Sequence, residues 1–208
     1  MPDASHRAPL PASEAEWAGW AERVQAAAEA AGATEILVDF ESRIPVETRL
    51  LAQVQFLAGR WNDALRQRRL RLHGLLPALV QALTLLGMAE RKQVRPIDGW
   101  LAADGVIHLR FLPGIEPTAL SAPEALSWLD GVQVDEVVVD CENLDNLTSS
   151  VIHWLLSLQS RIPSVELDRP VSRVALILAQ MRLDTIFPIR RPPPDVRKQT
   201  PMRLAKPR

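Results

Sequence analysis

The sequence is short of the residues on which common catalytic and metal-binding motifs depend. Cys141 is its one cysteine, which excludes an intrachain disulfide and a metal site built from cysteines. The nine glycines form no GxGxxG or GxxxxGK[ST] loop, so the usual routes to nucleotide binding are unsupported. No GxSxG elbow occurs, and the four histidines lie far apart, without metal-ligand spacing. We therefore expect no enzyme, no cofactor and no metal.

Long apolar runs and a strong net charge are also missing. The longest apolar stretch, Leu75 to Met88, is shorter than the roughly 20 residues of a membrane span. The first seventeen residues lack the apolar core of a secretory signal. The net charge of -1 gives no global reason to bind nucleic acid or an acidic membrane. These absences predict a cytoplasmic protein that does not insert into a membrane and is not suited to nucleic acid.

An internal repeat is the strongest positive feature. The segment 35–39, EILVD, has its counterpart 101 residues later in 136–140, EVVVD. The same spacing superimposes the apolar positions of the predicted helices that follow these segments. Beyond a longer loop in the first copy, a spacing of 95 relates the next strand and helix. Matching apolar positions across four elements indicate two copies of one unit.

The order of elements predicts the fold class. Strands that alternate with helices favour an α/β architecture with a mostly parallel sheet. In the second copy, Asp104-Gly105 joins two strand candidates, 97–101 and 106–112, into a predicted hairpin that makes the sheet mixed. The first copy lacks this hairpin. Each Asp that ends a repeated strand, Asp39 and Asp140, is interpreted as a turn or cap residue.

Four segments are therefore expected along the chain. They are an unstructured N-terminus at 1–12, a degenerate α/β unit at 13–92, a second α/β unit at 93–189 and a basic, Pro-rich tail at 190–208.

Residues 136–187 carry a family resemblance. A strand ending in Asp140 is followed by a loop, by LTSS at 147–150, and by an apolar helix, a strand and another helix. This order resembles the STAS family, the sulphate transporter and anti-sigma factor antagonist domains. Through the repeat, the resemblance extends more weakly to residues 33–88. It implies two tandem STAS-like units, each a mostly parallel or mixed sheet packed by helices.

The resemblance implies a phosphorylation site. In the antagonist branch of the family, a partner kinase phosphorylates the serine that follows an aspartate at a helix start. Ser149 falls on that position, and Thr48 takes it in the first copy. Thr148 stands where the family has the acidic residue, and Val151 where it has glycine, so that a β-branched side chain could hinder a kinase. The alternative is that Ser149 and Thr48 only cap their helices.

Partner contacts are expected around the same helix start. The candidate partner-binding residues are Thr148, Ser150, His153 and Trp154. Trp154 is predicted to lie off the core face formed by Ile152, Leu155 and Leu156, where it anchors a partner or packs on the neighbouring copy.

The sequence thus predicts a non-catalytic regulatory protein that resembles an anti-sigma factor antagonist and docks a kinase or anti-sigma partner near Ser149. Two alternatives remain open. One is a constitutive accessory subunit of a membrane transporter ATPase, as on bacterial lipid-transport ATPases. The other is a scaffold whose tandem copies form a homo-oligomer.

Overall fold

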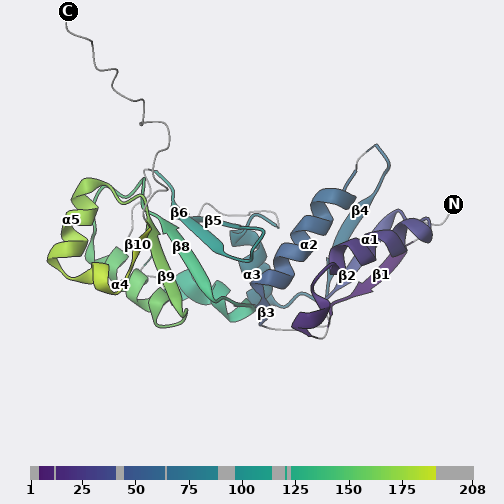
Figure 1. The fold of residues 1–208 in the computed structure, drawn as a ribbon, viewed down its shortest axis with the longest axis horizontal. Helices are drawn as coiled ribbons and strands as arrows, with labels where there is room; N and C mark the ends of the chain where they lie inside the picture. Colours follow the sequence, from purple (N-terminus) through teal and green to yellow (C-terminus); the bar gives the residue numbers. More distant parts are fainter. Residues whose placement is uncertain are drawn as a thin grey trace, which may run out of the picture.

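The computed structural model describes residues 5–11, 13–40, 45–63, 65–88, 97–113, 120 and 123–190, and it has the expected α/β architecture (Figure 1). Two units, each a sheet with helices, follow one another in an elongated molecule. Of the expected basic tail, Arg190 belongs to the last strand, and 191–208 lie outside the described residues.

The first unit is a three-stranded parallel sheet in the order β1-β2-β4. Its elements are β1 (Ser5–Pro9), η1 (Glu14–Glu16), α1 (Trp20–Ala30), β2 (Glu35–Asp39), β3 (Val46–Glu47), α2 (Thr48–Trp61), β4 (Arg69–His73) and α3 (Pro77–Leu85). Ile36 and Val38 of β2 are fully buried, because alternate side chains of a strand share one face, and this face belongs to the core.

The second unit is a five-stranded mixed sheet in the order β10-β9-β8-β6-β5. Its elements are β5 (Ile97–Leu101), β6 (Ile107–Phe111), η3 (Pro123–Gly131), β7 (Val132–Gln133), β8 (Glu136–Asp140), α4 (Ser149–Gln159), β9 (Ser164–Asp168), α5 (Ser172–Gln180), η4 (Leu183–Thr185) and β10 (Ile189–Arg190). Among the described strands of this sheet, β5 and β6 are the one antiparallel pair, as the Asp104-Gly105 hairpin predicts.

The helices and strands begin at the spacings of the sequence repeat. The pair β2 and β8 and the pair α2 and α4 each start 101 residues apart, whereas β4 and β9, like α3 and α5, start 95 apart. The backbone follows the same pattern. Gly74 and Arg169 both have positive φ, at 71° and 49°, and so do Gly87 and Arg182, at 70° and 54°. The two copies therefore share their turns as well as their apolar positions.

The N-terminal segment differs from expectation. Residues 1–12 are predicted to be unstructured, but Ser5–Pro9 forms β1 and pairs in parallel with β2. The prediction was wrong because only Ala8 of this strand is buried, so no apolar alternation marks it. The strand is stabilised by backbone pairing with β2 and not by burial of its own side chains. In addition, the indole N–H of buried Trp20 donates a hydrogen bond to the carbonyl of Pro9 at 3.3 Å.

The two units join through strand pairing and close helix packing. β3 pairs with β7 in parallel, with Val46 opposite Val132. α3 packs against η3 so closely that a Cβ on Gly131 would lie 2.5 Å from the backbone of Ala78. At the tip of the β5–β6 hairpin, a Cβ on Gly105 would lie 2.7 Å from Cγ of Arg49, in the first turn of α2. The second unit therefore covers the start of α2.

The close approach at Gly131 gives a stability prediction. The change Gly131→Ala forces η3 away from α3 and is expected to lower the free energy of unfolding by about 1–3 kcal/mol. Gly59→Ala is the matched control, because Gly59 lies on the exposed side of α2 with open space around it. It is expected to stabilise the protein by about 0.5–1 kcal/mol. Urea denaturation of both variants measures the difference, and equal stabilities would contradict the close packing.

Candidate functional site

The first turn of α4 carries the phosphorylation candidate of the second unit at the protein surface. Thr148 is the N-cap residue, with extended backbone, and its Oγ1 accepts a hydrogen bond from the amide of Val151 at 3.4 Å. Ser149 is the first helical residue and is exposed, whereas Ser150 is half-buried. Within the described part of the chain, the Ser149 hydroxyl has no hydrogen-bond partner. The cap is therefore Thr148, and Ser149 is left unbonded.

The inner face of α4 corrects the expected position of Trp154. Val151, Trp154, Leu155 and Leu158 are buried, and Trp154 is only 2% exposed. Its ring meets that of Phe111 edge to face, with the centroids 5.7 Å apart. Trp154 is therefore a core residue, not a surface anchor, because positions 151, 154, 155 and 158 share one face of a helix. Val151 also points into the core, so its side chain does not obstruct the approach to Ser149.

The outer face of α4 consists of Ser149, His153 and Leu156, which follow one another at helical spacing and are all exposed. Leu156 was expected in the core but is 41% exposed. Three more exposed apolar residues follow later in the second unit: Leu176 in α5, Met181 directly after α5 and Ile186 directly after η4. Half of the eight large apolar side chains that the described residues expose thus fall within residues 156–186 of the second unit.

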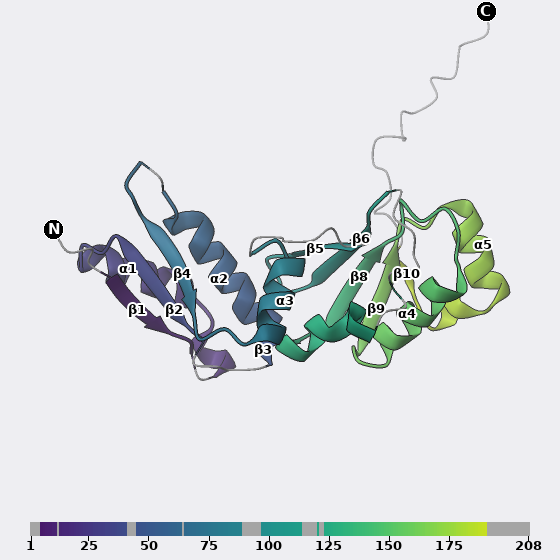
Figure 2. The same ribbon diagram turned by 180° about the vertical axis from the view of Figure 1, so that it is seen from behind.

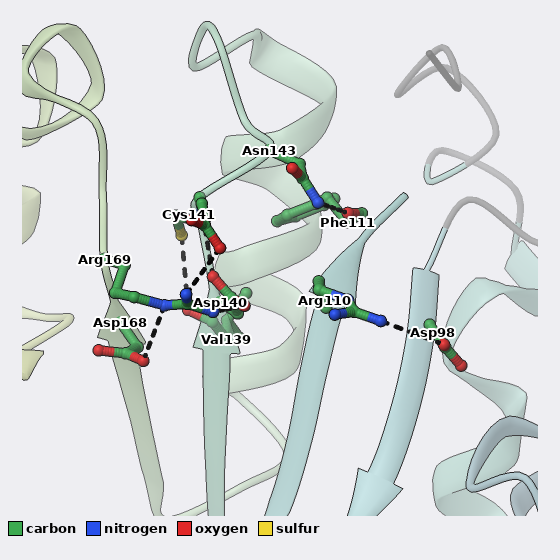
Figure 3. Close-up of polar contacts among 10 residues, drawn as sticks. Asp98, Arg110, Phe111, Val139, Asp140, Cys141, Asn143, Asp168 and Arg169 are labelled. Carbon is green, nitrogen blue, oxygen red and sulfur yellow. Dashed lines mark hydrogen bonds and ion pairs between the residues drawn. The ribbon is translucent and has the colours of Figure 1, made fainter. Parts of the chain in front are cut away.

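An ion-pair cluster holds the loop that leads into α4 (Figure 3). Asp140, at the end of β8, is buried and pairs with Arg169, which follows β9. Arg169 also reaches Glu142 at 2.6 Å and Asp168 at 3.5 Å. Burial acts to lower the pKa of Arg169, but attraction by Asp140, Glu142 and Asp168 raises it above its ordinary value. Asp140 therefore anchors a turn, as its place at the end of a strand predicts.

Two further contacts fix the same loop. The side-chain amide of Asn143 donates to the carbonyl of Phe111 at 3.0 Å, which ties the loop to β6. The backbone N–H of Cys141 donates to the carbonyl of Asp168 at 2.8 Å, which ties it to β9. The Cys141 side chain is fully buried. The loop between β8 and α4 is thus held from both sides, so the first turn of α4 has a fixed position.

The equivalent turn of the first unit is covered. Thr48 corresponds to Ser149 but is only 5% exposed, so its hydroxyl is not accessible to a kinase in this structure. Glu47, the counterpart of Thr148, pairs with Gln133 of β7, and Arg49 lies under the hairpin tip at Gly105. The turn that is open in the second unit is therefore occupied by protein in the first.

No group of three or more His, Cys, Asp or Glu side chains among the described residues is placed to hold a metal ion. Within the same ranges, no helix combines the length and the apolar character needed to span a membrane.

No protein-family model, no curated protein and no solved structure matches this chain. Its function has to be argued from its own residues.

The ion-pair cluster predicts a large cost for removing Arg169. The change Arg169→Gly leaves Asp140 buried without its cation and is expected to lower the free energy of unfolding by about 1–3 kcal/mol. Glycine also relieves the positive φ, so this loss reports on the ion pairs and not on the backbone. Arg182→Gly is the matched control, because Arg182 has the same backbone conformation and is exposed. If both variants unfold alike in urea, the cluster does not stabilise the loop.

The buried thiol predicts a pH dependence of stability. Burial, with repulsion from Asp140 and Asp168, raises the pKa of Cys141 from 9.0 to about 12. Between these values the unfolded chain loses a proton that the folded chain keeps, so stability falls as pH rises through this window. The expected slope is at most about 1.4 kcal/mol per pH unit. Unfolding at pH 9 to 11 should show a shallower slope for Cys141→Ala, and identical slopes would contradict the assignment. The chain has no tyrosine to add to the signal.

Proposed function

We propose that the chain is a non-catalytic, cytoplasmic regulatory protein of the STAS type, which docks a protein partner through the outer face of α4. The observation that carries the proposal is the contrast between the two repeat units. Thr48 of α2 is buried where the first unit meets the second, while its counterpart Ser149 of α4 is exposed and has no hydrogen-bond partner among the described residues. A surface that is covered by protein in one copy is suited to bind protein in the other.

The composition of this surface supports docking. Protein interfaces combine an apolar centre with polar groups at the rim. Leu156 and Leu176 supply exposed apolar area, and Ser149 and His153 supply the polar groups. Partner binding would remove these two leucines from water.

Phosphorylation of Ser149 offers a switch. The amide groups at the start of an α-helix lack intrahelical partners and lie at the positive end of the helix dipole. Phosphate on Ser149 would add a charge of about -1.5 to -2 there. Exposed Asp145 in the loop before α4 is already negative, so a partner would meet a more acidic surface. This is the logic of partner switching in the anti-sigma antagonist branch.

The test is capture of partners by the tagged full-length chain in its own cells, quantified by mass spectrometry. A protein kinase or an anti-sigma factor is expected with the unaltered chain. Leu156→Arg should lower its recovery at least about tenfold, because a charge replaces apolar contact area. Leu65→Arg is the matched control, because Leu65 is 97% exposed but belongs to the first unit, and it should leave recovery unchanged.

The switch itself is tested by Ser149→Asp, which is expected to abolish that recovery. Ser172→Asp is the control, because Ser172 is likewise an exposed first residue of a helix, α5. Recovery of a transporter ATPase that tolerates Ser149→Asp but not Leu156→Arg would replace partner switching with a constitutive accessory role. Recovery of the chain alone, with concentration-dependent self-association, would favour a scaffold.

A further inference from the structure

A second site lies at the free edge of the first sheet, far from α4. β1 is the outermost strand, and β2 is its one neighbour among the described strands. The repeat shows what this position normally holds. β1 and β6 are counterparts, since His6 lies opposite Ile36 as Ile107 lies opposite Val137. β6, however, has β5 on its other side, in antiparallel orientation.

A groove follows this free edge. It has a volume of about 560 Å³, and consecutive residues 6–11 form one of its sides. Trp20, Val24 and Ala27 of α1 line the other side. A groove between an edge strand and a helix is a known setting for strand addition, in which backbone hydrogen bonds give affinity and side-chain pockets give specificity.

We propose that this groove binds an extended segment of a partner protein, which joins the sheet as a strand antiparallel to β1. The bound segment takes the place that β5 has in the second unit. Natural proteins protect or cover edge strands, because their backbone groups otherwise pair with other chains. The first unit lacks the hairpin that covers this edge in the second unit, so a partner strand completes its sheet.

The repeat also defines the register and chemistry of the segment. In the second unit, Leu101 lies opposite Ile107 and Trp100 opposite His108. By the repeat, an apolar residue of the segment faces α1 opposite His6, and the next residue lies opposite Arg7 on the other face. The Arg7 side chain is 66% exposed, and its guanidinium pairs with the buried carboxylate of Asp39 in β2. Because that charge already has its partner, the segment needs no acidic residue there. It is apolar at alternate positions, with an aromatic residue facing Arg7 where the second unit has Trp100.

A second copy of β1 fits this edge less well. Antiparallel pairing of two copies about the middle of the strand would place Arg7 opposite Arg7. Each guanidinium would still have only its own Asp39 as counter-charge, and like charges directly opposite one another destabilise a strand pair. A partner strand with a different side chain at that position avoids the repulsion.

The test is a titration of the ¹⁵N-labelled full chain with a synthetic peptide of residues 97–103, the natural neighbour of β6. Amide shifts should change in residues 5–10, and hydrogen exchange of β1 should slow at least about tenfold at saturation. Ala27→Trp fills the groove from exposed Ala27 and should weaken binding at least tenfold. Ala26→Trp, on the next exposed residue of α1, which does not line the groove, should change it less than twofold.

A fused variant provides a second measurement. Placing residues 97–106 directly before His6, instead of residues 1–5, supplies the missing hairpin within the chain and should abolish peptide binding. No shift in β1 at millimolar peptide, or equal weakening by the two tryptophan variants, would overturn the proposal. So would a dimer that Ala27→Trp dissociates, because the occupant would then be a second copy. None of these outcomes bears on α4, whose partner is tested separately.

Discussion

The pairing of β3 with β7 holds the start of α2 against the second unit, and the difference between the two repeat copies depends on it. β3 leads directly into α2, so the pairing carries Thr48 and Arg49 under the hairpin tip at Gly105. α3 then packs against η3 at a distance that only glycine at position 131 permits. Two units with the same helices, strands and turns therefore present one closed and one open copy of the same surface.

The contacts at the closed copy are the model for the partner that we propose for the open one. At the start of α2, the contacts come from β7 and from the tip of the β5–β6 hairpin, and Thr48 is buried there. The start of α4 has the same helical geometry, and the Asp140–Arg169 cluster fixes the loop before it. A partner would therefore meet a turn that is already in position, so binding would cost little ordering of the chain.

Much of the fold could be predicted because the repeated strands and helices have clear apolar periodicity. β1 could not be predicted, because Ser5–Pro9 buries only one side chain and forms a strand by pairing with β2. Of the candidate site, the helix start at Ser149 could be predicted, but the orientation of α4 could not. Residues 151–156 are apolar except for His153, so the sequence allows more than one buried face, and packing against Phe111 decides it. The role of Arg169 was missed because two of its partners, Asp140 and Glu142, lie at the end of another strand and in the loop after it.

The chain is elongated, and both views place β1 and α1 at one end and α4 and α5 at the other (Figures 1 and 2). A ligand bound along β1 therefore cannot block one bound on α4. If both proposed sites are filled, the chain would act as a spacer that holds two proteins at once, one at each end of the molecule.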